Sequence, residues 1–135
     1  MSKRRVVVTG MGIISPVGNT VAEAWANIVA GKSGVGRITH FDVTNYPTKI
    51  AAEVKGFDPA QYITPKDIKK MDPFVHYGIA SSVQALKDSG LEVTEANAAR
   101  VGVAVGAGIG GLTNIEKAHT SIIENNNSPK RVSPF

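Results

Sequence analysis

The stretch from Arg100 to Leu112 constrains the fold of this chain more than any other. Its β-branched residues Val101, Val103 and Val105 alternate with glycine and alanine, which predicts a buried strand. Glycines then crowd the following turn, at positions 106, 108, 110 and 111. Because glycine has no side chain to hold a neighbour away, we expect another group to approach this turn closely.

The start of the chain repeats the succession of strand, glycine turn and helix. Arg5 to Thr9 is an apolar, β-branched run, typical of a strand covered on both faces. Thr20 is expected to cap the next helix in a capping box with Glu23, and Gly31 to end it. Between residues 34 and 64, short apolar pieces separated by turn residues predict a loop with a small hairpin.

Three further helices are predicted, over residues 64–70, 72–90 and 113–124. The first has Thr64 as N-cap and Pro65 as its first helical residue, and the second begins in the same way at Asp72. The third is expected to start with a capping box of Thr113 and Glu116.

Strands that alternate with helices indicate an α/β layered fold with parallel strands. Two predicted strands are few for such a sheet, since natural sheets have roughly four to six. We therefore expect these residues to be part of a domain that continues beyond Phe135.

Charge and cysteine content narrow the function classes. Fifteen basic and eleven acidic residues give a net charge of +4, which favours a solubilising surface over a nucleic-acid-binding one. The sequence has no cysteine, so disulfides, thiolate metal sites and a cysteine nucleophile are excluded within these residues. The apolar run after Arg5 is interrupted by Gly10 and Gly12, far short of the roughly 20 residues of a membrane span. The expected location is the cytoplasm.

The glycine turn also fits a nucleotide-binding motif. Gly106, Gly108 and Gly111 have the G-x-G-x-x-G spacing between a predicted strand and a helix, which can hold a pyrophosphate. That motif expects an acidic residue about 20 positions later, after a second strand. Here the interval is a predicted helix followed by residues 125–127, which are all asparagine. A tight turn that packs a strand on a helix is the alternative, and it is favoured.

No other catalytic or metal-binding pattern is visible. His40, His76 and His119 lie in different segments without a metal-ligand spacing, so each is expected to be a packing or surface residue. No G-x-S-x-G elbow occurs. We therefore expect neither a metal nor a cofactor.

Five motifs occur in order along the chain: RRVVVTGMGIISPVGN, KKMDPFVHYGI, ALKDSGLEVT, VGVAVGAGIGGL and SPF. Together they resemble the β-ketoacyl-[acyl carrier protein] synthases of type II, condensing enzymes of the thiolase-like superfamily. The resemblance covers the whole chain but only the N-terminal third of the family enzyme. It implies a layered α/β/α/β/α fold and a homodimer.

The resemblance also implies a reaction. Family members pass an acyl group from acyl carrier protein to a cysteine and condense it with decarboxylated malonyl-carrier protein, giving a 3-oxoacyl product. The family's cysteine and two histidines lie beyond the position that matches Phe135, so no catalytic residue can be assigned here. We expect these 135 residues alone to be inactive. A non-catalytic module that binds the carrier protein and, less favoured, a dinucleotide-binding domain remain alternatives.

Two residues match substrate-binding positions of the family. Ile109 matches the residue that gates the acyl-chain pocket; a plain core isoleucine is the alternative. Phe135 matches an aromatic residue near the dimer interface and the partner's acyl pocket.

Basic residues match the surface that meets the acidic carrier protein. Lys66, Lys69 and Lys70 match its first part, and Lys130 and Arg131 match its second part. The spacing of the three lysines places them on one helical face, from which they can steer an acidic partner. An ordinary solvated helix face is the alternative.

Overall fold

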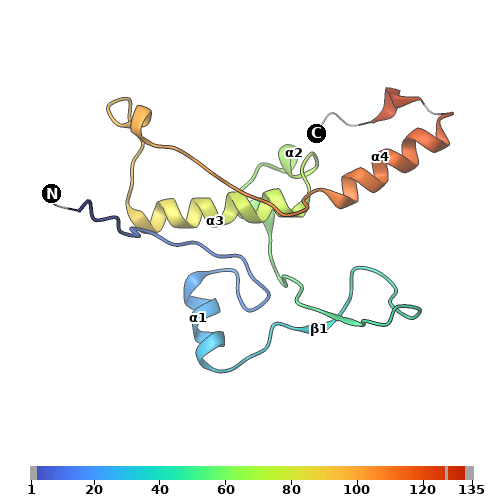
Figure 1. The fold of residues 1–135 in the computed structure, drawn as a ribbon, viewed down its shortest axis with the longest axis horizontal. Coiled ribbons are helices and arrows are strands. Elements are labelled where there is room, and N and C mark those ends of the chain that lie inside the picture. Colours follow the sequence, from blue (N-terminus) through green and yellow to red (C-terminus); the bar gives the residue numbers. More distant parts are fainter. Residues whose placement is uncertain (1–2, 127, 133–135) are drawn as a thin grey trace. The chain divides into compact units, whose positions relative to one another are not determined.

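The structure is a computed structural model and describes residues 3–126 and 128–132. Its helices are α1 (Val21–Val29), α2 (Pro65–Ile68), α3 (Pro73–Ser89) and α4 (Leu112–Glu124) (Figure 1). Short 3₁₀ turns are η1 (Pro59–Gln61), η2 (Ala98–Arg100) and η3 (Pro129–Arg131). The described residues divide into two compact units, one of residues 3–58 and 80–92 and one of residues 59–79 and 93–132.

In the first unit, α1 begins and ends as the sequence predicts. The Thr20 hydroxyl oxygen accepts a hydrogen bond from the backbone N–H of Glu23, at 3.2 Å. The Glu23 carboxylate reaches back to the backbone N–H of Asn19, at 2.8 Å, one residue earlier than in a standard capping box. Gly31 follows the helix with a positive φ of 67°, the conformation that glycine adopts without strain.

The N-terminal segment lies against the second half of α3 in the same unit. The backbone N–H of Met11 donates to the Asp88 carboxylate at 2.9 Å, and that of Ile13 donates to the Gln84 side chain at 3.2 Å. A Cβ on Gly12 would lie 2.0 Å from the carbonyl oxygen of Ser81. Only glycine permits this approach of two backbones.

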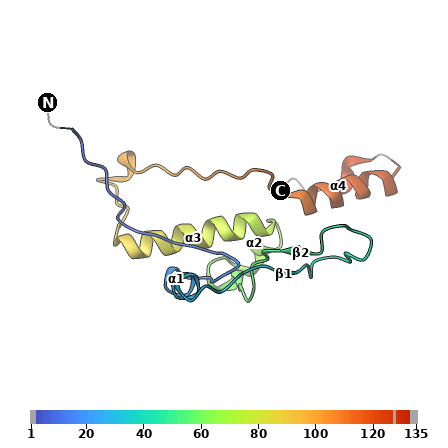
Figure 2. The ribbon, with the colours of Figure 1, turned by 60° about the horizontal axis from the view of Figure 1, so that its bottom comes forward.

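The predicted hairpin is present between residues 36 and 51. Strand β1 (Gly36–Arg37) pairs antiparallel with β2 (Ile50–Ala51), and a long loop joins them (Figure 2). At its base, Glu53 accepts hydrogen bonds from the backbone N–H of Thr39, at 3.0 Å, and from the Thr39 hydroxyl, at 2.8 Å.

In the second unit, the predicted helix starts hold for α2 and α3 but not for α4. Thr64 caps α2 and Pro65 is its first residue, and α3 begins at Pro73. The capping box predicted from Thr113 and Glu116 is wrong. Helix α4 begins one residue earlier, at Leu112, and its N-cap is Gly111, which has no side chain to accept a hydrogen bond.

The two segments predicted as strands are extended but unpaired among the described residues. Residues 5–9 and 101–105 form no ladder, and the second runs as an extended orange trace before α4 (Figure 1). Val6 is 94% exposed and Val103 is 86% exposed. A strand needs a neighbour for its backbone N–H and C=O groups, and no described segment supplies one. The expectation that these valines are buried is therefore not met within the described residues.

Candidate functional site

The glycine turn, residues 106–111, is held at its C-terminal end by the start of α3. Asp72 is buried, and its carboxylate accepts a hydrogen bond from the backbone N–H of Asn114 at 3.2 Å. This N–H belongs to the first turn of α4, where backbone donors have no partner within the helix. A Cβ on Gly110 would lie 2.6 Å from the ring of Phe74. The close approach predicted for this turn therefore occurs at Gly110.

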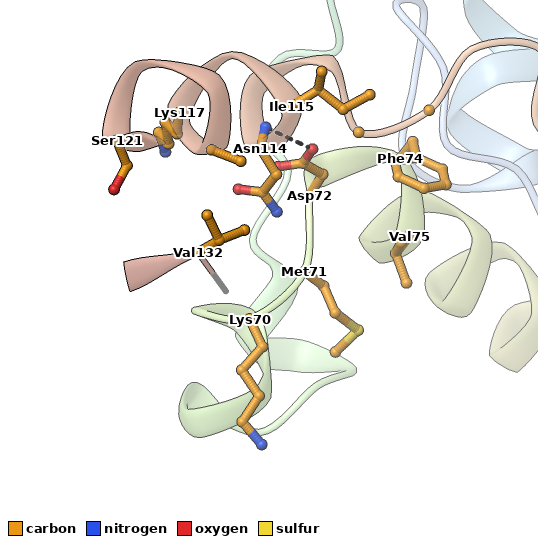
Figure 3. Close-up of a pocket in the computed structure, with 13 residues that line it drawn as sticks. Lys70, Met71, Asp72, Phe74, Val75, Asn114, Ile115, Lys117, Ser121 and Val132 are labelled. Carbon is orange, nitrogen blue, oxygen red and sulfur yellow. Dashed lines mark hydrogen bonds between the residues drawn. The ribbon is translucent and has the colours of Figure 1, made fainter. Parts of the chain in front are cut away.

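A cavity of about 730 Å³ lies beside this contact (Figure 3). Its lining is mainly apolar, with Met71, Phe74, Val75, Ile115 and Val132 among the residues that form it. The polar side chains at its wall include Lys70, Lys117 and Ser121. Asp72 and Asn114 also line it, so the cavity is suited to an apolar group with a polar end.

Ile109 precedes the fixed end of the turn, and its side chain is 79% exposed. None of the described residues buries Ile109, so its core alternative is neither confirmed nor contradicted. Its predicted role as a gating residue remains a prediction.

Of the three lysines of the predicted carrier surface, Lys66 lies within α2, and Lys69 and Lys70 follow it. Lys66 and Lys69 are exposed, and no ion-pair partner is found for either among the described residues. Lys70 instead contacts Asp67, with its ammonium group 3.1 Å from the carboxylate. The pKa of Asp67 is lowered, chiefly by the Thr64 hydroxyl that donates to it and secondly by Lys70. Of the three lysines, Lys66 and Lys69 are therefore the two with no ion-pair partner among the described residues.

The second part of the predicted surface lies in η3. Lys130 is exposed there, and Arg131 is the last residue of η3. Val132, directly after η3, lines the same cavity as Lys70. Phe135 lies outside the described residues.

The glycine motif and the three histidines form no ligand site within the described part of the chain. A Cβ placed on Gly106 or Gly108 would meet no atom of the described residues within 4 Å. His76 is buried and contacts the carbonyl oxygen of Ile68 at 3.2 Å, while His40 and His119 are exposed, as expected for packing and surface residues. Among residues 3–126 and 128–132, no group of three or more His, Asp or Glu could hold a metal ion. Across the same residues, none of the helices has both the length and the apolar character of a membrane span.

The sequence interpretation missed the role of Asp72. It identified Asp72 only as the start of α3, whereas the carboxylate caps α4 from 42 positions away. No signal in the sequence indicated this contact, because the sequence pointed to Thr113 as the cap, whereas the structure places Gly111, which has no side chain, at the N-cap.

The similarity to known proteins extends over the whole chain. Residues 3–135 match the family model described as "Beta-ketoacyl synthase, N-terminal domain". The chain is 61% identical over 135 residues to the 3-oxoacyl-[acyl-carrier-protein] synthase 2 of Vibrio cholerae, 58% to that of Vibrio harveyi and 52% to that of Coxiella burnetii. Each comparison covers all of this chain and 32% of the relative, so the chain spans about a third of their length.

Solved structures agree with these relatives. The ishigamide ketosynthase/chain length factor matches with a TM-score of 0.77 and 31% identity, over 98% of this chain and 33% of the other. A β-ketoacyl synthase from Burkholderia phymatum matches with a TM-score of 0.75 and 31% identity, over 98% and 32%. The thiolase-like α/β fold expected from the sequence is confirmed, with this chain as its N-terminal part.

Proposed function

Because the chain belongs to the β-ketoacyl synthase family, we propose that it is the N-terminal part of a 3-oxoacyl-[acyl carrier protein] synthase of type II. The observation that carries this proposal is the 61% identity over all 135 residues to a synthase of that name. The protein is then an acyltransferase of fatty acid elongation, and its domain continues beyond Phe135.

The proposed reaction has two steps. A cysteine thiolate attacks the thioester of acyl-carrier protein, forms an acyl-enzyme thioester and releases the carrier thiol. Malonyl-carrier protein then loses CO₂, and the resulting carbanion attacks the acyl-enzyme carbonyl. A carbon–carbon bond forms, the cysteine thiolate leaves, and 3-oxoacyl-carrier protein is the product. The thiolate is supplied by residues outside this sequence, which contains no cysteine.

We assign to this chain the docking of the carrier protein. Lys66 and Lys69 support the assignment, because their ammonium groups are exposed and lack an ion-pair partner among the described residues. Lys70, Lys130 and Arg131 complete the proposed surface. Exposed positive charges attract an acidic partner and mainly raise its rate of association.

Ile109 is the proposed gating residue of the acyl-chain pocket. Its exposed side chain on a glycine-flanked turn supports this role, since it has room to change rotamer. Phe135 is proposed to lie near the partner subunit of a homodimer. The proposed location of the enzyme is the cytoplasm.

Charge reversal tests the docking surface in the full-length protein. We expect Lys66→Glu combined with Lys69→Glu to raise the KM for the carrier protein about tenfold with little change in kcat, because two attractive charges become repulsive. The matched control reverses Lys3 and Lys32, which are exposed in the other unit.

The assay distinguishes a failure of the proposed function from a failure of the proposed docking surface. If the unsubstituted full-length protein forms no 3-oxoacyl product, the proposed function is wrong. If it forms product and both double variants have the same KM, only the docking surface is wrong.

A further inference from the structure

We propose that Asp72 and Phe74 are positioning residues for the glycine turn and set the position of Ile109 at the mouth of the acyl-chain pocket. The inference rests on the proposed gating role of Ile109. It adds two residues that lie more than thirty positions earlier in the chain and that no sequence motif connects to that role.

Asp72 fixes the start of α4. The residue is 7% exposed, and one of its carboxylate oxygens accepts the Asn114 N–H at 3.2 Å. A buried carboxylate at this place satisfies an unpaired backbone donor and lies at the positive end of the helix dipole. The same oxygen lies 3.3 Å from where a Cβ on Gly111 would be, so the carboxylate also contacts the turn itself.

Phe74 fixes the residue directly after Ile109. Ring carbons of Phe74 lie 2.6 Å from the position of a Cβ on Gly110, so a side chain at 110 would force the ring or the turn to shift. Gly111 has a φ of 74°, which a residue with a side chain adopts only with strain. Residue 110 is therefore held by its contact with Phe74, and residue 111 lies against the Asp72 carboxylate in a conformation that favours glycine.

The glycines just before Ile109 have no such close contact, although Val105, directly before the turn, lies 3.6 Å from where a Cβ on Gly78 of α3 would be. Among the described residues, nothing lies within 4 Å of a Cβ built on Gly106 or Gly108. Ile109 itself is 79% exposed, so its own side chain does not anchor it. Its position therefore follows from residues 110 and 111, and these are fixed by Asp72 and Phe74.

The first experiment removes the hydrogen bond in the full-length protein. We expect Asp72→Ala to speed amide exchange at Asn114 about tenfold and to shift the ratio of kcat/KM for long and short acyl primers in the same direction as Ile109→Ala. Asp72→Asn keeps an oxygen that can accept the bond, and we expect it to recover most of both effects. Asp88→Ala removes a similar bond, to Met11 N–H, and should change neither readout.

The second experiment exploits the contact between Gly110 and Phe74. Gly110→Ala places a methyl group against the ring, and we expect it to shift the primer ratio roughly threefold or more. Phe74→Ala in the same chain removes the ring and should restore most of the wild-type ratio. A double variant whose effect is the sum of the single effects overturns the role of Phe74.

The readouts distinguish the possible failures. Faster exchange at Asn114 with an unchanged primer ratio overturns the positioning role of Asp72. An unchanged ratio in Ile109→Ala overturns the gating role and the inference with it. A full-length protein that forms no 3-oxoacyl product contradicts the proposed function, and unchanged exchange at Asn114 in Asp72→Ala overturns the structural basis of the inference independently of activity.

Discussion

Gly12 leaves no room for a side chain between the N-terminal segment and α3. A Cβ there would lie 2.0 Å from the Ser81 carbonyl oxygen, which is backbone and cannot rotate away. We expect Gly12→Ala to destabilise the full-length protein by about 2 kcal/mol, because the segment or the helix must shift. The shift of the thermal unfolding midpoint measures this.

Gly36→Ala is the matched control for that prediction. The nearest atom to a Cβ at Gly36 is the flexible end of the Lys55 side chain, at 3.8 Å. The thermal unfolding midpoint of Gly36→Ala should therefore stay close to that of the unsubstituted protein. Equal midpoints for Gly12→Ala and the unsubstituted protein would contradict the close packing of the N-terminal segment on α3.

At the scale of single residues, the sequence predicts where glycine is needed. It does not predict which group approaches each glycine. The crowding expected around residues 106–111 occurs at Gly110, against Phe74, and is absent at Gly106 and Gly108 within the described part of the chain. The group that approaches Gly110 is the Phe74 ring on α3. The spacing of residues within the turn cannot predict a contact with another helix.

At the scale of elements, local helix signals predict the structure well. Thr20 and Glu23 are three residues apart, so their capping interaction depends only on the first turn of α1. The cap of α4 depends on tertiary packing instead, since its acceptor is Asp72 on the segment before α3. This is why the predicted box of Thr113 and Glu116 failed while the caps of α1 and α2 were confirmed.

The base of the β1–β2 hairpin gives a pH-dependent prediction. The Thr39 backbone N–H and then its hydroxyl lower the pKa of Glu53 below its ordinary value of 4.5, and His40 contributes less. Because the folded-state pKa is lowered, the stabilisation is fully present above pH 4.5 and is lost as the pH falls through the folded-state value. Glu53→Gln should therefore lower the unfolding midpoint at about pH 7 and have little effect near about pH 3.

Glu95→Gln, at an exposed position outside the hairpin, is the control for that experiment. A gap between Glu53→Gln and the unsubstituted protein that stays constant from neutral to acid pH would contradict the assignment.

At the scale of the whole molecule, strand–turn–helix patterning predicts the fold class but not the state of the strands. The α/β assignment is confirmed by ketosynthase structures that match 98% of the chain. The valines at 6–8 and 101–105 nevertheless have no strand partner within the described residues. Sheet pairing is a long-range property, and this chain covers about a third of the length of its relatives.

This chain supplies only part of what the proposed reaction needs. The described residues supply exposed lysines, a cavity beside the glycine turn and a turn held from α3. The proposed reaction also needs a thiolate, and the sequence has no cysteine. The proposed function therefore places carrier docking and acyl-chain selection in these residues and the covalent step in others.

One assay tests this division most directly: detection by mass spectrometry of 3-oxoacyl-carrier protein after incubation with acyl- and malonyl-loaded carrier protein. We expect the full-length protein to form the product with loss of one CO₂ per condensation, and the 135-residue chain to form none. Product from the 135-residue chain alone, or its absence with the full-length protein, would contradict this division of roles.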